Sequence, residues 1–446
     1  MAEIEPLRAL HYDPAIAGSL ADVTAPPYDV IDPAQRAALL ERSPNNIVAI
    51  DLPLGGPGAE HEDGRDGDHE DGRDGDPYAT AAALLADWRG RGIVVRDPEP
   101  AIWAQTQEYT TPDGRRLRRH GFYCRVKIED YGPGRIRPHE RTHPGPKEDR
   151  LMLTRATKTN VSPIFSLYSD PAQAAWAALE PATAEAPWAQ IADGEGTVHR
   201  LWRVGNQAAI AAVRDATRDA ELLIADGHHR YETMQAYARE VGGRGEHSYV
   251  LMCLVAIEDP GLTVFPTHRL IGRLDEGRRA ALWQALERDF QIEEVPVERI
   301  APTQPAGAPQ SPLELGYIER LDGRALRLTL KDQAIADAAL PGRSDAYRHL
   351  DTGVLEALLL RGALGYSERD IARLHNFFYA RSTEEALRLV LADPSPIGGA
   401  YDAAFFLRPT PVSQVRDVAA AGENMPPKST YFYPKLLTGL LLNPLA

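Results

Sequence analysis

The stretch LLIADGHHRYETMQAYARE, residues 222–240, decides how the fold is interpreted. Residues 221–225 predict a short buried strand, and residues 228–241 have the spacing of an amphipathic helix. Asp226-Gly227 forms the tight turn between them. A strand that leads through a turn directly into a helix is typical of α/β proteins.

The turn between this strand and this helix combines the features of an anion-binding site. Gly227 can adopt a positive φ or let a ligand approach the backbone closely, and Asp226 is placed to cap the helix. The N–H groups of the first helical turn and the positive end of the helix dipole attract anions. Arg230 can donate two parallel hydrogen bonds to a phosphate, and His228 and His229 add further donors. The alternative is a plain turn with solvent-facing histidines, but this residue combination favours a phosphate-binding turn.

Strands and helices alternate on both sides of this stretch and predict a mixed α/β (α+β) fold. We expect three regions: an N-terminal α/β region at 1–98, a core with the phosphate-binding turn at 99–275, and a C-terminal α/β domain at 276–446. A hairpin is expected from 101–110 and 117–128. Other strands are expected at 47–52, 161–168, 199–204, 248–258, 262–266, 315–321, 325–330 and 403–407, and helices at 33–42, 78–91, 208–218, 350–361 and 383–391.

The composition of the whole chain limits the classes of function. The 446 residues are 43% hydrophobic and 25% charged, which is ordinary for a globular protein. A net charge of -15 argues against broad binding to nucleic acid, which relies on basic surface. We find no stretch of about 20 apolar residues for a membrane span and no signal peptide at the N-terminus. The two cysteines, Cys124 and Cys253, lie in apolar segments, so we expect buried thiols in a cytoplasmic protein.

An acidic insert interrupts the N-terminal region. The octapeptide HEDGRDGD occurs twice in tandem, from His61 to Asp76. Such a segment cannot bury enough apolar surface to fold, so we predict a disordered insert at 60–76 and exclude it from the site. The segment 301–312, rich in Pro, Ala and Gln, is expected to be a linker or long loop.

A second polar cluster, PHERTHPGPKEDR, spans residues 138–150. It contains a formal H-E-x-x-H pattern, which binds zinc only on a helix where both histidines share a face. Prolines on both sides leave no room for a two-turn helix, so we expect a polar loop rather than a zinc site. His139 and Glu140 are its candidate catalytic residues, and Thr142, Lys147 and Arg150 are candidate substrate or phosphate contacts.

Two further clusters contain basic side chains beside rigid or aromatic residues. One is Phe265-Pro266-Thr267-His268-Arg269, and the other spans residues 425–435. Their candidate contacts to a phosphate or a carboxylate are His268, Arg269, Lys428 and Lys435, although loop packing explains such residues equally well. The sequence contains no P-loop motif, no G-x-G-x-x-G after a strand and no C-x-x-C.

The ordered set of these motifs resembles a large bacterial and archaeal family of unknown function, often labelled ParB/SpoOJ-like. The resemblance rests on residues 25–30, His139-Glu140 with Thr142, and residues 147–150, 226–231, 267–269 and 425–435. The order of the H-E element and the D-G-H-H-R turn also resembles the ParB/sulfiredoxin superfamily, which includes free serine kinases. This resemblance implies a nucleotide-binding core with extra N- and C-terminal regions.

The resemblance to free serine kinases also implies roles for particular residues. Residues Asp226 to Arg230 would hold the phosphates of ATP or ADP, and Glu140 would be the base on the substrate hydroxyl. Mg²⁺ would bridge phosphate oxygens, with Asp226 as its candidate protein ligand. We therefore predict a kinase that phosphorylates a small hydroxyl compound, with free L-serine as the leading substrate and O-phosphoserine as its product.

Two other functions stay open at this point. One is a nucleotide-responsive, ParB-like DNA-binding or partition regulator, although neither a helix-turn-helix nor a basic stripe is evident. The other is a metal-dependent hydrolase that would use His228, His229, His139 and Glu140. The sequence decides neither the phosphate donor nor the oligomeric state.

Overall fold

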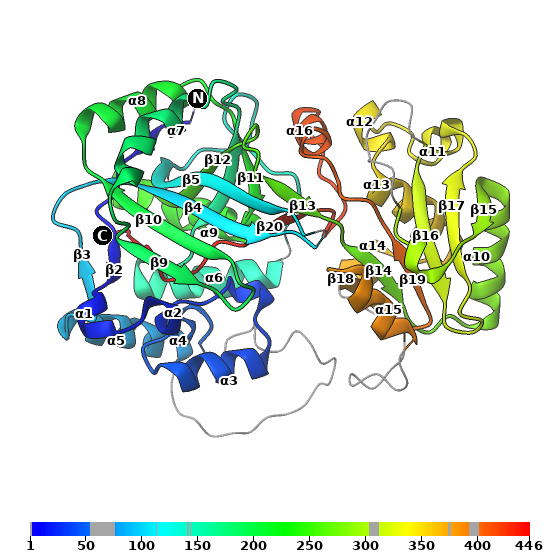
Figure 1. The fold of residues 1–446 in the computed structure, drawn as a ribbon, viewed down its shortest axis with the longest axis horizontal. Helices are drawn as coiled ribbons and strands as arrows, with labels where there is room; N and C mark the ends of the chain where they lie inside the picture. Colours follow the sequence, from blue (N-terminus) through cyan, green and yellow to red (C-terminus); the bar gives the residue numbers. More distant parts are fainter. Residues whose placement is uncertain are drawn as a thin grey trace. The chain divides into compact units, whose positions relative to one another are not determined.

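The computed structural model describes residues 2–53, 76–112, 114–140, 142, 144–302, 312–372, 376–391 and 401–446. The chain forms two compact units (Figure 1). Unit 1 contains Met1–Pro138, Thr142–Leu262 and Pro434–Ala446, and unit 2 contains His139–Arg141 and Thr263–Tyr433. Residues of the predicted N-terminal region and core share unit 1, and the division into three regions stays a prediction. The predicted acidic insert, except Asp76, and most of the predicted linker lie outside the described residues.

Unit 1 is built on a nine-stranded sheet in which most neighbouring strands are antiparallel. Its order is β6-β11-β8-β12-β5-β4-β10-β9, and β1 also pairs with β5. Only β6 with β11 and β8 with β12 are parallel among the described strands. The strands are β1 (Ile4–Glu5), β4 (Ile102–Thr110), β5 (Arg116–Lys127), β6 (Ile136–Arg137), β8 (Ile164–Tyr168), β9 (Ala189–Ala192), β10 (Val198–Val204), β11 (Leu222–Asp226) and β12 (Tyr249–Ala256).

The core of unit 1 forms where this sheet meets its helices. Phe122, Cys124, Ile164, Met252 and Leu254 are buried on the central strands and pack in one cluster with α8 and α9. The predicted hairpin is confirmed, since β4 and β5 pair from Trp103↔Tyr123 to Thr110↔Arg116. Both cysteines are buried and not disulfide-bonded, as expected.

Local capping explains where several helices of unit 1 begin. The Asp32 side chain accepts a hydrogen bond from the Gln35 N–H, and the Asp32 N–H donates in return to the Gln35 side-chain oxygen. The helix α3 therefore starts with a capping box, and Pro33 lies in its first turn. In Figure 1, α7 and α8 lie together, and α6 passes beside α9. The helices are α1 (Pro14–Ala17), α2 (Leu20–Val23), α3 (Pro33–Arg42), α4 (Val48–Asp51), α5 (Pro77–Gly90), α6 (Pro144–Thr157), α7 (Ala174–Leu179), α8 (Gln207–Thr217) and α9 (His228–Val241).

Two sequence predictions in unit 1 are wrong. Residues 47–52 were expected to form a strand, but they contain α4, because a short apolar run can be a buried helical turn as easily as a strand. The Asn46 side chain accepts a hydrogen bond from the Val48 N–H and starts this turn. Residues 144–150 were interpreted as part of a polar loop, but they form the first half of α6, which continues to Thr157. A proline in the first turn of a helix is tolerated, so Pro144 does not prevent it.

The C-terminal segment, Pro434–Ala446, returns to unit 1 and pairs with several of its parts. Thr438 pairs with Ala25, and Leu442 pairs with Leu10, in isolated bridges. At the end, β21 (Asn443–Pro444) pairs with β7 (Thr159–Asn160), and another short pair joins β2 (Leu10–Tyr12) to β3 (Val94–Arg96). Residues from the two ends of the sequence therefore share one unit.

Unit 2 contains a six-stranded antiparallel sheet of order β15-β17-β16-β19-β14-β18 and a two-stranded ribbon, β13-β20. The π-helical stretch Glu356–Ala363 continues α13 and extends two residues beyond the predicted helix 350–361. Its strands are β13 (Thr263–Phe265), β14 (His268–Ile271), β15 (Phe290–Glu294), β16 (Glu314–Glu319), β17 (Ala325–Leu330), β18 (Phe377–Ala380), β19 (Ala403–Phe406) and β20 (Tyr431–Tyr433). Its helices are α10 (Glu276–Asp289), α11 (Gln333–Ala339), α12 (Asp345–Arg348), α13 (Asp351–Leu355), α14 (Glu368–Ala372), α15 (Thr383–Leu391) and α16 (Val412–Ala420).

The predicted fold class, a mixed α/β protein, is confirmed by both sheets and their helices. The remaining predicted strands and helices are present with shifts of one to three residues at their ends. Within the described part of the chain, none of the helices has the length and apolar character that crossing a membrane requires.

Candidate functional site

The candidate site is the junction of β11 and α9 in unit 1. Residues Leu222 to Ala225 of β11 are buried between neighbouring strands, and the chain turns at Gly227 with φ 98° and ψ 29°. This left-handed conformation is the one for which glycine is favoured, and the predicted positive φ is confirmed. The helix α9 begins at the next residue, His228.

Gly227, and not Asp226, takes the N-cap position of this helix. Glycine has no side chain, so the N-cap residue itself makes no capping hydrogen bond. The first intrahelical bond runs from the Tyr231 N–H to the Gly227 carbonyl oxygen. The positive end of the α9 dipole thus lies directly after the Asp226-Gly227 turn.

The Asp226 carboxylate instead joins two cations that are far apart in the sequence. Its Oδ2 atom lies 2.6 Å from Arg230 Nη2, and its Oδ1 atom lies 2.8 Å from Lys435 Nζ. The three side chains are 17%, 11% and 17% exposed for Asp226, Arg230 and Lys435. With one carboxylate and two cations, the group carries a net positive charge beside the N-terminus of α9. We call residues 226–230 together with Lys435 the anion site.

The Arg230 side chain lies against the protein rather than pointing into solvent. It donates to the Pro163 carbonyl oxygen and to Asp226. Burial alone would lower the pKa of its guanidinium, but the carboxylates of Asp226 and Asp29 raise it, so the charge is retained. These contacts make Arg230 a part of the local packing as well as a candidate phosphate contact.

The two histidines of the turn differ in burial. His228 is buried and His229 is half-buried, so the alternative of two solvent-facing histidines does not describe this turn.

Two candidate contacts from the polar cluster 138–150 bind a residue of α9. The Thr142 hydroxyl and the Lys147 ammonium group both bind Glu232 Oε2, at 2.7 and 2.9 Å. Sequence reasoning missed Glu232, although it follows Arg230 by only two positions.

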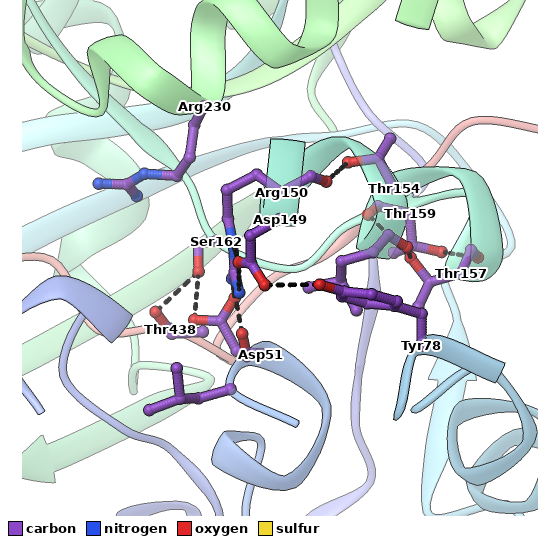
Figure 2. Close-up of polar contacts among 12 residues, drawn as sticks. Asp51, Tyr78, Asp149, Arg150, Thr154, Thr157, Thr159, Ser162, Arg230 and Thr438 are labelled. Atoms are coloured by element: carbon purple, nitrogen blue, oxygen red, sulfur yellow. Dashed lines mark hydrogen bonds and ion pairs between the residues drawn. The ribbon is translucent and has the colours of Figure 1, made fainter. Parts of the chain in front are cut away.

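Arg150, another candidate contact, belongs to a buried ion-pair network (Figure 2). Its guanidinium pairs with Asp51 at 3.1 Å and with Asp149 at 2.5 Å, and the Tyr28 ring covers it at 4.2 Å. Tyr78 donates a hydrogen bond to Asp149. Burial raises the pKa of Asp51, whereas the neighbouring Arg150 guanidinium lowers it. We call Asp51, Asp149 and Arg150 the buried ion-pair network.

A chain of hydroxyl groups extends from this network. Ser162 donates to Asp51 Oδ2 at 2.9 Å and lies 3.0 Å from the Thr438 hydroxyl. In Figure 2, the Arg230 guanidinium lies on the side of Ser162 away from Arg150, and none of the dashed contacts drawn there involves it. Arg150 and Arg230 line a common cavity of about 30 Å³, which suffices for one or two water molecules and not for a nucleotide. The predicted role of Arg150 as a direct ligand contact is therefore not supported by its surroundings.

Unit 2 contains the other predicted site residues. Glu140 pairs through its backbone with Met425, and its side chain accepts a hydrogen bond from the Lys428 N–H at 3.4 Å. His139 lies 2.9 Å from the Thr430 hydroxyl. Neither His139 nor Glu140 is helical, so the zinc-protease interpretation is excluded by the geometry that it requires.

His268 and Arg269 are buried in unit 2 on β14. The Leu407 N–H donates to His268 Nδ1, so its Nε2 carries the proton toward the Thr383 hydroxyl. Burial, together with the neighbouring charge of Arg269, lowers the pKa of His268 to about 3. Arg269 donates to the Thr267 carbonyl oxygen and stacks on Tyr379 at 4.6 Å. These contacts make both residues parts of the packing of unit 2.

The described residues contain no group of three or more His, Cys, Asp or Glu side chains arranged to hold a metal ion. Asp226, the predicted Mg²⁺ ligand, has both carboxylate oxygens paired with cations. That arrangement does not fit a carboxylate that coordinates Mg²⁺ directly.

Residues 4–353 match the model of a family described as a protein of unknown function, DUF1015. This chain belongs to that family. The expected membership of a family of unknown function is confirmed, whereas the ParB/SpoOJ-like label stays a prediction. A comparison with curated proteins finds no match.

Several solved structures are similar to this chain at low identity. A conserved hypothetical protein from Pyrococcus furiosus is 13% identical with a TM-score of 0.35, over 71% of this chain and 95% of that chain. A free serine kinase in complex with AMP is 13% identical with a TM-score of 0.34, over 71% of this chain and 92% of that chain. A C-terminally truncated SbnI from Staphylococcus aureus is 12% identical with a TM-score of 0.30, over 68% of this chain and 82% of that chain. Similarity at these TM-scores does not establish an activity for this DUF1015 protein.

Proposed function

We propose that this DUF1015 protein binds the phosphate groups of ATP or ADP at the anion site and transfers a phosphoryl group to a small hydroxyl compound. The observation that carries the proposal is the meeting of Arg230 and Lys435 at the N-terminus of α9. A helix N-terminus and two cations are the groups that phosphate oxygens bind in proteins.

Asp226 has a different role in this proposal from the one first predicted. Its carboxylate holds Arg230 and Lys435 close together, and the two cations would otherwise repel each other. A phosphate group that approaches the N-terminus of α9 would share both cations with Asp226. The site thus offers positive charge that is already in position, which phosphoryl transfer requires.

Free L-serine stays the leading acceptor, because the motifs of the sequence resemble those of free serine kinases. Glu140 remains the proposed base on the substrate hydroxyl. Mg²⁺ is proposed to arrive with the nucleotide on its phosphate oxygens, since the Asp226 carboxylate is already paired with two cations.

The proposal is tested first by binding and then by turnover. ADP and ATP should raise the melting temperature of the wild type, since a ligand at 100 times its Kd stabilises by about 2.7 kcal/mol. The protein is then incubated with Mg²⁺, either nucleotide and L-serine or another small hydroxyl compound, and O-phosphoserine or another phosphorylated product is detected by mass spectrometry.

The variant Glu140→Gln separates a kinase from a regulator. It keeps the size of the side chain and removes its charge, so nucleotide binding should be retained while turnover falls by ~10² to 10⁴-fold. Glu384→Gln serves as its control, because it makes the same chemical change at an exposed carboxylate in the first turn of α15 of the same unit and should leave binding and turnover unchanged. A wild type that binds nucleotide and DNA but makes no phosphorylated product would contradict the kinase proposal.

A further inference from the structure

The first residues of the C-terminal segment cross β4 and β5 of unit 1 and place Lys435 at the anion site. Two buried side chains of these strands hold the backbone there. Arg119 donates to the Pro434 carbonyl oxygen at 2.6 Å, and Gln107 Nε2 donates to the Lys435 carbonyl oxygen at 2.9 Å. Arg119 and Gln107 are only 1% and 2% exposed.

The orientation of the Gln107 amide is fixed by its neighbour. Arg119 Nε lies 3.0 Å from Gln107 Oε1, and a guanidinium group can only donate hydrogen bonds. The amide oxygen must therefore face Arg119. Gln107 Nε2 then faces the Lys435 carbonyl oxygen, where it acts as a donor.

His199 completes this arrangement on the opposite side of the amide. Its Nδ1 atom lies 3.3 Å from Gln107 Nε2 and must accept, since that nitrogen is a donor. The other ring nitrogen, Nε2, then carries the proton and donates to Asp193 Oδ2 at 2.9 Å. Each hydrogen bond in the series that joins Asp193, His199, Gln107 and Lys435 therefore has one defined direction.

We infer that Gln107 is a positioning residue of the anion site, which fixes the Lys435 ammonium group beside Asp226 through the Lys435 carbonyl oxygen. The inference rests on the proposed phosphate-binding function of that site. Without this donor, a half-buried carbonyl oxygen loses its partner and the backbone shifts toward another one. The Lys435 side chain then leaves the position that Asp226 and the N-terminus of α9 require.

The test measures the Kd of ADP by isothermal titration calorimetry for the full chain and its variants. Gln107→Met should weaken ADP binding about fivefold to tenfold, which corresponds to one lost hydrogen bond. Gln105→Met is the matched control, because Gln105 is equally buried on the same face of β4 and bonds to Cys253. It should change the Kd less than about twofold.

A double-mutant cycle distinguishes positioning from general damage to the fold. In a Lys435→Met background, Gln107→Met should change the Kd less than about twofold, because the group that it positions is gone. Gln107→Glu provides a second variant, since it still accepts from Arg119 but cannot donate to Lys435. It should weaken ADP binding as Gln107→Met does.

Hydrogen exchange of the peptide 434–440 gives a readout that needs no ligand, and it should be faster in Gln107→Met than in the wild type. An unchanged Kd in Gln107→Met, or an equal loss with and without Lys435, would overturn the inference. A wild type that binds neither ADP nor ATP would instead contradict the proposed function, and faster exchange would still support the positioning of Lys435.

Discussion

Unit 1 contains two arginine centres that share a cavity wall and differ in what they can do. The positive charge of Arg150 is paired with two buried carboxylates, and an aromatic ring covers the guanidinium. The network therefore has no positive charge left to bind an anionic ligand. Arg230 shares the carboxylate of Asp226 with Lys435 beside a helix N-terminus, so these three side chains together keep a net positive charge. Asp29 and Asp51 act on Arg230 only from a greater distance, by raising its pKa. The comparison teaches that the balance of charge and exposure around an arginine separates a structural role from a binding role.

The largest expected effect concerns the buried ion-pair network. Arg150→Met leaves Asp51 and Asp149 as buried carboxylates without their cation, and breaking such a network costs about 3 to 5 kcal/mol. The free energy of unfolding in urea measures this loss. Arg155→Met, in the same helix, removes only an exposed pair with Glu240 and should cost at most about 1 kcal/mol. Similar losses for both variants would show that the network is not a structural centre.

The next prediction concerns Arg230 and separates its effect on stability from its effect on ADP binding. Arg230→Met removes the contacts to Asp226 and to the Pro163 carbonyl oxygen and should destabilise by about 1 to 3 kcal/mol. It should also weaken ADP binding at least about tenfold, because a charged contact to phosphate is lost. Arg239→Met, farther along α9 with an exposed partner, should change neither quantity. If Arg230→Met lowered stability alone, the two arginine centres would have the same structural role.

A smaller effect, the dependence of stability on pH, is expected for the buried His268 and extends the comparison to unit 2. The folded-state pKa of His268, about 3, lies below its ordinary value of 6.5, because the buried ring resists protonation. Its contribution to stability is therefore complete above pH 6.5 and is lost as the pH falls from there toward 3. The loss amounts to about 1.4 kcal/mol per pH unit. Unfolding experiments from pH 7 to 5 should show a shallower decline in His268→Gln than in the wild type, and equal declines would contradict a buried, neutral histidine.

Much of the fold follows from local patterns in the sequence. The strand–turn–helix at 222–241 and the hairpin around residue 114 were predictable, since strand period, helix spacing and the turn glycines agree there. The short turn α4 and the start of α6 were not. The apolar run of α4 fits both a strand and a helical turn, and the prolines at the start of α6 fit both a loop and a first helical turn. Tertiary packing selects one conformation in each case.

The site was predictable in its residue types but not in its contacts. The turn 226–230 and Lys435 were both candidates, yet nothing in the sequence shows that Asp226 pairs with a lysine 209 positions away. Gln107, Asp51 and Glu232 were missed because single polar residues carry no motif. A polar residue at an inward position of an apolar strand, such as Gln107 on β4, is the signal that could have identified one of them.

The central claim is that the cations at the N-terminus of α9 bind phosphate. Titration of pyrophosphate into the wild type and Lys435→Met by calorimetry tests it most directly, because pyrophosphate lacks a base and a ribose. We expect saturable binding in the wild type, about tenfold weaker binding in Lys435→Met, and similar melting temperatures, since Asp226 keeps its ion pair with Arg230 in that variant. Lys127→Met, at an exposed pair with Glu3 in the same unit, should bind as the wild type does. Equal affinity of the wild type and Lys435→Met, or no binding in the wild type, would contradict the account.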